Sequence, residues 1–558
     1  MTELAPNIIP PRHPNQVMKL ARMGSFHQCR LSFMRTLLRR LKSEQWRFEQ
    51  ARFDIDAQGV GTALYCAHGP DRSYTLVAFA NDLPPEKRSD RVIATEWDAT
   101  FTLFDGIPTD ADVDRLRANV PLQEAGRITE SELSLSRANR SVRLWEHVVD
   151  RLAAGQQPDT DLVQSVGYLM RTTAVYGSAK FGAADREVIA DRPEFSSPFQ
   201  VEMLSVFLTR SFVMDLVEHM ARAKSPDAVP LNPALRRTFG IGNSTGLGMA
   251  PFLLHHPQLL NNWIAAKEEA LARIRSLRAA NADAVATFMG FIPRAMKMAA
   301  IWRSEHPLQI QKLAALNTDV ATLQTYLQTF DFNGDHPWNR LYEWAETKLS
   351  IEGQELLVSL MMEPYGDLID GLTGCMAADE SIGHRIDGTV SLGDTITQLQ
   401  HIYAFAENLN WDSPECTARA WYVSEEKLEP RLGERFEEPI AEYEQPLQPA
   451  RDAMRMLGDI KTYVPETPLA AFLLQHPEHR HTARRIQIAA RWPYAEIRDN
   501  TIAHDMLPID MLRCKLSFFG AGYFDPRSDR WVRINMFRNA PFPDDLANED
   551  ADNWTYPS

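Results

Sequence analysis

The stretch of this chain with the clearest chemical potential is rich in glycine and small polar residues. Glycine tolerates positive φ and lets the backbone approach a ligand closely. A glycine-rich turn that leads into a helix also directs free N–H groups at one point, where the helix dipole attracts an anion. We therefore predict an anion-binding loop formed by Gly240, Gly242, Asn243, Ser244, Thr245, Gly246 and Gly248.

The spacing of these glycines, G-x-G-x-x-x-G-x-G, differs from both common nucleotide-binding patterns. It is not the dinucleotide fingerprint, and it lacks the Lys-Ser/Thr that ends a P-loop. The preceding residues 233–239 have the composition of a short helix rather than a strand, so a Rossmann or Walker site is not expected. The alternative interpretation is that the glycines serve only close packing between helices.

A second glycine-flanked segment offers positive charge. Lys180 lies between Gly177 and Gly182, on a tight loop where an amine meets an anion or, when desolvated, acts as a base. Arg171 and Tyr176 precede it and are predicted to bind the substrate and to transfer a proton, respectively. The alternative is a helix that ends at glycine, followed by a solvated lysine.

Three other residues complete the predicted site. Glu363 precedes Pro364 in a segment that carries further carboxylates, and a buried carboxylate can serve as acid or base. Acidic residues at a helix start also stabilise the helix dipole without any function. His256 is another candidate for proton transfer. Arg513 is a candidate clamp for a carboxylate, because guanidinium pairs bidentately with such groups.

Histidines do not predict a metal site in this chain. His476, His479 and His481 are close in sequence, but His476 is separated from the others by a helix break, and the following arginines 484–485 oppose a cation. Zinc needs three or four converging ligands, so we predict no metal. Histidine precedes proline five times, at His13, His256, His306, His336 and His476, where a helix end explains it.

Composition and charge limit the class of protein. The 558 residues include 44% hydrophobic and 24% charged residues, and the net charge is −15, so neither nucleic acid nor membrane is expected as a partner. Five scattered cysteines and the absence of a signal-peptide pattern at the N-terminus indicate a reduced protein in the cytoplasm. The basic amphipathic segment 30–42 is expected to dock on an acidic body.

The hydrophobic pattern predicts an α+β protein that is predominantly α-helical, with a small antiparallel sheet. We expect an N-terminal arm and amphipathic helix at 1–45, a β-meander at 46–110 and an all-helical body with the site at 111–510. The last part, 511–558, is expected to form a β-hairpin that joins the sheet, with strands at 513–519 and 530–537, and an extended tail.

These patterns together predict a soluble enzyme of lyase or hydrolase type that uses general acid–base chemistry on a small anionic carboxylate or phosphate metabolite. No cofactor is predicted, and a homo-oligomer is expected. One alternative is an oxidoreductase that depends on a flavin or a nucleotide, with the glycine loop on a phosphate. The other is a non-catalytic helical assembly or regulatory protein.

Overall fold

The structure is a computed structural model that covers most of the chain. It describes residues 9–84, 87, 96–122, 126–173, 189, 191–245, 257–302, 307–376, 384–411, 421–424, 430–432, 440–444, 448–498, 513–514, 516–521, 524–528 and 531–556.

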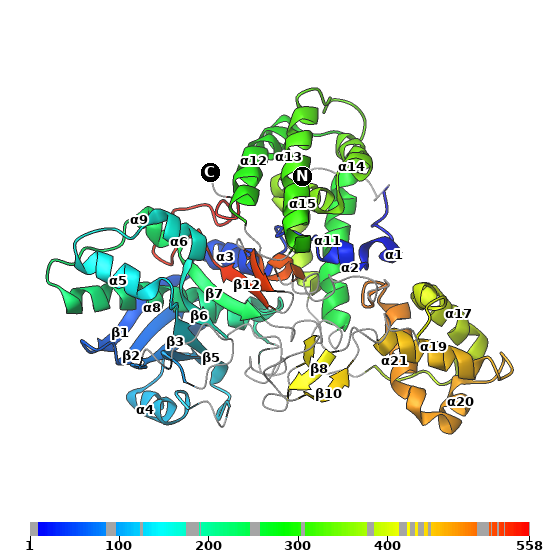
Figure 1. The fold of residues 1–558 in the computed structure, drawn as a ribbon, viewed down its shortest axis with the longest axis horizontal. Helices are drawn as coiled ribbons and strands as arrows, with labels where there is room; N and C mark the ends of the chain where they lie inside the picture. The colour runs from blue at the N-terminus through cyan, green and yellow to red at the C-terminus, as the bar shows by residue number, and fades with distance from the viewer. Residues whose placement is uncertain are drawn as a thin grey trace.

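A mixed β-sheet, curled like half of a barrel, forms one part of the molecule (Figure 1). Its strands follow the spatial order β1-β2-β3-β4-β5-β6-β7-β12-β11. All neighbouring pairs are antiparallel except β6 and β7, which are parallel. The strand bounds are Arg47–Ile55 (β1), Gly61–His68 (β2), Ser73–Ala80 (β3), Ala99–Asp105 (β4), Glu132–Arg140 (β5), Tyr168–Thr172 (β6), Gly240–Thr245 (β7), Phe524–Ser528 (β11) and Trp531–Met536 (β12).

This sheet shows that the predicted fold class is wrong, although more of the described residues lie in helices than in strands. The sheet is not small, and β5, β6 and β7 lie inside the range 111–510 that was predicted to be helical. β5 and β6 were assigned to helices because their leucines and methionine continue the apolar pattern of the neighbouring helices. Pairing with distant strands decides their conformation instead, since strand preference depends strongly on tertiary context.

The C-terminal hairpin also differs from the prediction. β11 and β12 form it, and β12 pairs with β7 at the end of the sheet opposite to the N-terminal strands. The first predicted strand, 513–519, is helical at 513–514 and 516–519. Its apolar side chains, among them Leu516 and Phe519, are buried in the main core, and such a short apolar run does not distinguish strand from helix.

One long helix, α8 (Gln200–Lys224), packs against strands β2 to β7 and forms much of the core under the sheet. Its buried residues lie on all sides, as expected for a helix enclosed by protein. The other helices of this part are α3 (Phe33–Ser43), α4 (Asp110–Asn119), α5 (Trp145–Ala153), α6 (Thr160–Val166), η2 (Pro193–Phe195) and α9 (Pro233–Thr238).

A second group of helices rises beside the sheet (Figure 1). It shares one continuous apolar core with the sheet and α8. By length and composition alone α12 could cross a membrane, but core helices of other proteins pass the same test. The bounds are Pro257–Arg275 (α11), Ala282–Ile301 (α12), Pro307–Leu327 (α13), Pro337–Lys348 (α14), Ile351–Met362 (α15), Glu363–Tyr365 (η3), Gly366–Ile369 (α16) and Asp370–Met376 (η4). The short helices α1 (Pro14–Val17) and α2 (Leu20–Met23) lie beside this second group of helices, where α2 contacts α15 (Figure 1).

A third group of helices lies apart from the others and has its own core (Figure 1). We call it the small helical unit; it consists of α17 (Leu392–Tyr403), η5 (Ala404–Ala406), α19 (Gln448–Ile460), α20 (Leu469–Gln475), η6 (Pro477–His479) and α21 (Arg480–Arg491). A three-stranded sheet occurs in the chain between its helices: β8 (Trp421–Ser424), β9 (Pro430–Leu432) and β10 (Ile440–Glu444).

Replacing Gly240 by alanine tests how tightly β7 is packed. A Cβ at this position would collide with the Asn535 side chain and with the backbone of Met536. We expect a loss of about 1–3 kcal/mol in the free energy of unfolding, the usual cost of overpacking. Urea denaturation measures it.

The matched control is Gly290→Ala on α12, where a Cβ would meet nothing within 4 Å. Alanine there is expected to stabilise the protein by about 0.5–1 kcal/mol through helix propensity. Equal effects of the two substitutions would contradict this account of β7.

Candidate functional site

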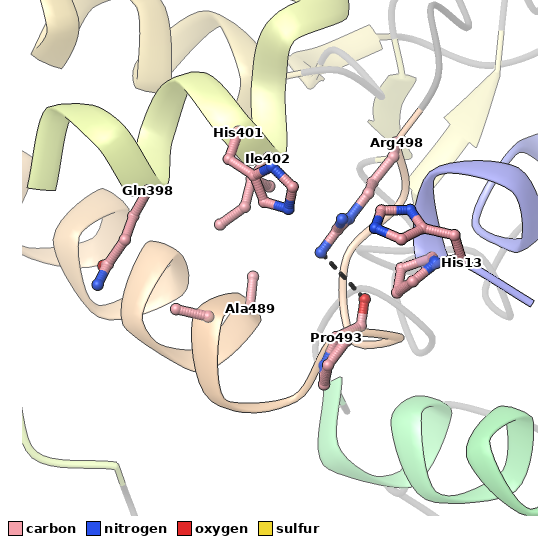
Figure 2. Close-up of a pocket in the computed structure, with 9 residues that line it drawn as sticks. His13, Gln398, His401, Ile402, Ala489, Pro493 and Arg498 are labelled. Atoms are coloured by element: carbon pink, nitrogen blue, oxygen red, sulfur yellow. Dashed lines mark hydrogen bonds between the residues drawn. The ribbon is translucent and has the colours of Figure 1, made fainter. Parts of the chain in front are cut away.

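A pocket of about 320 Å³ lies where the N-terminal segment meets the small helical unit (Figure 2). α1 and its cap form one wall, α17 forms the second, and the end of α21 with the following turn forms the third. The residues that line it are His13, Pro14, Gln398, His401, Ile402, Ala489, Ala490, Pro493 and Arg498.

His13 is held in place by the start of α1. It is the N-cap residue of this helix, and its Nδ1 accepts a hydrogen bond from the backbone N–H of Asn15 at 3.2 Å. Because Nδ1 is an acceptor, the proton of the neutral imidazole lies on Nε2. Pro14 follows at the first helical position, where its fixed φ suits a helix. The cap thus sets both the position of the ring and its tautomer.

His401 is the second imidazole of the pocket. It lies in the last turn of α17, where a basic side chain suits the helix dipole. Its ring meets the His13 ring edge to face, with the centroids 6.2 Å apart and the planes at 89°. Both histidines are exposed, so they reach solvent and any ligand that enters the pocket.

Arg498 supplies a buried positive charge beside the two imidazoles (Figure 2). Only 6% of this residue is exposed. Its Nη1 donates to Asn15 Oδ1 at 2.7 Å and its Nη2 to the Pro493 carbonyl at 3.1 Å, while Nε has no hydrogen-bond partner. Burial lowers the pKa of this guanidinium, although the charge of nearby Glu496 opposes the shift.

No carboxylate forms a salt bridge with Arg498 among the described residues. Glu496 is the nearest candidate, but its Oε2 contacts Arg485 Nε at 2.5 Å and its charge is thereby offset. A buried cation that is held only by neutral groups favours an anion nearby, since removing a charge from water is costly unless it is paired. Ile402 and Ala489, both nearly fully buried, add apolar surface to the pocket.

The described part of the predicted glycine segment, residues 240–245, forms the strand β7 of the sheet. Arg171 of β6 is paired with Gly242, and a Cβ at Gly242 would lie 2.8 Å from Arg171 Cγ and from the Tyr168 ring. Close strand packing thus explains glycine at 240 and 242. Asn243 is buried, and its amide donates to the Thr172 carbonyl at 3.0 Å.

Other residues of the predicted site lie wholly or partly outside the part of the chain that the structure describes. The backbone of Ser244 and Thr245 belongs to β7, but their side chains lie outside the described residues. The same holds for the whole of Tyr176, Lys180, Gly246, Gly248 and His256. The predicted anion-binding role of this loop therefore stays a prediction. The structure brings Arg171, Gly240, Gly242 and Asn243 together.

The last two predicted residues, Glu363 and Arg513, form buried ion pairs in the helical part. Glu363 accepts from both Nη atoms of Arg35 at 2.6 and 2.7 Å. Arg513 pairs with both carboxylate oxygens of Glu352 on α15, one of them 2.7 Å from Nη1. Arg513 does clamp a carboxylate, but this carboxylate belongs to the protein.

The pocket leaves no recognisable pattern in the amino-acid sequence. His13 was explained by the helix end at the following proline, and His401 and Arg498 were not singled out. Nothing local marks them, because residues 13, 401 and 498 meet only through the packing of α1 against the small helical unit. A buried arginine without a carboxylate partner is visible only in the folded protein.

Comparison with protein-family models, with curated proteins and with solved structures finds no match for this chain.

The Arg513–Glu352 pair makes a prediction about stability. Burial alone would raise the pKa of Glu352, but the charge and hydrogen bonds of Arg513, with a smaller contribution from His27, outweigh it and hold this pKa well below its usual range. Glu352→Gln removes the negative charge opposite the buried guanidinium of Arg513, and we expect the free energy of unfolding to fall by about 3–5 kcal/mol at pH 7.

The stabilisation of the protein by the Arg513–Glu352 pair depends on pH in a defined direction. A carboxyl whose pKa is lowered by folding stabilises the protein above its unfolded pKa of about 4.3 and loses this effect as the pH falls further. In urea denaturation at several pH values, the difference between wild type and Glu352→Gln should shrink below about pH 4.3. Glu343→Gln on the exposed face of α14 is the control and should change little. A difference that stays constant down to pH 3 would rule out the ion pair.

Proposed function

We propose that the protein binds a small anionic molecule, a carboxylate or a phosphate, in the pocket between His13, His401 and Arg498. The observation that carries this proposal is the buried guanidinium of Arg498, which contacts neutral oxygens and has no salt bridge within the described part of the chain. An anion in the pocket would supply the missing negative charge, and charge-assisted hydrogen bonds are the strong ones.

The histidines provide the chemistry of the proposed site. With its Nδ1 occupied by the Asn15 N–H, the His13 ring presents Nε2–H as a donor to a bound oxygen. Histidine is the side chain that most readily gains or loses a proton near neutral pH, so the pair can move a proton to or from the ligand. We therefore propose general acid–base catalysis of lyase or hydrolase type on this anion.

The size of the pocket limits the ligand. A volume of about 320 Å³ lies at the lower end of the range of small-molecule sites, about 300–1,000 Å³. The volume suits a small metabolite better than a dinucleotide or a flavin. The apolar surface of Ile402 and Ala489 would contact its carbon skeleton, while the charged groups orient its anionic end.

Calorimetric titration with phosphate and with small mono- and dicarboxylates tests the proposal. His401→Asn should weaken binding of the best anion about tenfold or more, since charge-assisted hydrogen bonds contribute about 1.5–3 kcal/mol. Arg498→Met should weaken it at least as much.

The matched control is His481→Asn, an exposed histidine on α21 that does not line the pocket. It should leave affinity unchanged. The melting temperature of each variant separates lost binding from lost folding, which matters most for Arg498 because of its bonds to Asn15 and Pro493. The absence of binding by every anion, or an equal loss in His481→Asn, would refute the proposed function.

A further inference from the structure

Four side chains with metal-binding atoms converge at the end of α19 and the turn between α20 and α21. They are Asp459, His476, Glu478 and His479; each offers one ligand atom, and the four atoms all lie within 4.8 Å of one another. We infer that these residues form a zinc site. Two imidazole nitrogens and two carboxylate oxygens belong to the donor set of Zn²⁺, whereas Mg²⁺ and Ca²⁺ prefer oxygen ligands alone.

Aromatic packing fixes the two imidazoles of this site. Phe472 of α20 is fully buried, and both rings stack on it, His476 with centroids 4.7 Å apart and His479 with centroids 5.7 Å apart. His479 is itself only 6% exposed. The turn of η6 therefore aims both rings at one point, although a helix break separates them in sequence.

Hydrogen bonds around His476 leave one of its nitrogens suited to a metal. The Tyr463 hydroxyl donates to Gln475 Oε1 at 2.9 Å, so it must accept from His476 Nε2, which lies 3.0 Å away. The other nitrogen, Nδ1, then presents its lone pair to the Glu478 carboxylate at 3.1 Å. His476 Nδ1 and the Glu478 carboxylate oxygen are then both acceptors, and at this distance they need a cation or a second proton between them. Tyr463 would orient the metal-bound ring, as outer partners of ligating histidines commonly do.

The two carboxylates complete the proposed coordination. Asp459 Oδ2 lies 2.7 Å from His479 Nε2, and the side chains of Asp459 and Glu478 are about half exposed, at 49% and 59%. Adjacent ligand atoms of a tetrahedral zinc are about 3.4 Å apart, from the usual bond lengths. Small rotations of these half-exposed side chains would lengthen the 2.7 Å separation and shorten the longer ones to that value, and ions can enter from solvent.

Both arginines that the sequence set against a cation have partners. Arg485 is paired with Glu496, which offsets its charge, and Arg484 donates to the His384 carbonyl at 3.1 Å. The objection that arginines 484–485 repel a cation is therefore weakened, because the charge of Arg485 is compensated. Asp459 lies in α19, before the histidines in the sequence. It joins His476 and His479 as a ligand in place of His481, which the sequence pattern grouped with them.

A second group in the described part of the chain is less suited. Glu49, Cys66 and His68 offer only three ligands. Burial raises the pKa of the Cys66 thiol, which disfavours the thiolate that zinc binds. The four-ligand group is therefore the stronger candidate.

The proposed zinc has a structural role. Four protein ligands leave no open position, as in structural zinc sites. The small helical unit has a core of its own, separate from the main core, and small cores are often reinforced by a metal. Zinc would join the end of α19 to the junction of α20 and α21.

Titration of the full-length protein with ZnCl₂, after removal of metal with a chelator, tests this inference. We expect one tight equivalent per chain, a higher melting temperature with zinc, and no comparable effect of Mg²⁺. His476→Gln, Asp459→Asn and Glu478→Gln should each weaken zinc binding about tenfold or more, and Co²⁺ in the same site should show the absorption of tetrahedral coordination.

Two controls isolate this site. His481→Gln, two residues beyond His479, should bind zinc as the wild type does. His401→Asn should lose the anion but keep the zinc, so a failure of the proposed anion site is distinguishable from a failure of the zinc site. The inference is overturned if the wild type has no tight equivalent, or if His481→Gln weakens zinc binding as much as His476→Gln.

Discussion

Buried ion pairs centred on α15 are the constraint on which the arrangement of the helical part depends. Glu355 of this helix contacts three cations, with Arg12 at 2.6 Å, Arg22 at 2.7 Å and Lys267 at 2.9 Å. Burial would raise the pKa of Glu355, but these three charges hold it well below its usual range. Separating these deeply buried charges would leave unpaired ions in the interior. The free-energy cost of such ions is far larger than the net contribution of the pairs to stability.

These pairs hold both ends of the chain against the middle. The N-terminal segment supplies Arg12 and Arg22, and α3 supplies Arg35, which binds both Glu363 and Asp552. The basic amphipathic segment thus does dock on acidic groups, which come from the helical part and from the C-terminal tail. Because the planar guanidinium binds carboxylates in a fixed geometry, the pairs set the position of the N-terminal segment. That segment carries His13, and its position forms one wall of the pocket.

The sequence predicts local structure well where one period governs a long stretch. The long helix α8 extends over Gln200–Lys224, inside the range 111–510 that was predicted to be helical. The sequence does not predict local structure where pairing with a distant segment determines the conformation. Residues 168–172 continue an apolar helical pattern, but Gly167 has φ of 73° and ends α6, and the next five residues pair with β5 and β7. Glu363 and Arg513 were recognised as charged candidates, but their partners Arg35 and Glu352 lie far away in sequence.

The proposed anion and zinc sites lie toward opposite ends of one helix, α21. His479 directly precedes this helix, whereas Ala489 near its end lines the pocket. Twelve residues of helix span about 18 Å, roughly twice the Debye length of about 8 Å at physiological salt. Direct attraction between Zn²⁺ and the anion is therefore weak. Any coupling between the sites must therefore act through the mobility of the helices. Zinc would restrain α19, α20 and α21, and the pocket depends on the position of α21 against α17 and α1. A ligand that binds a more ordered protein loses less conformational entropy, so zinc would favour the anion without contact between them.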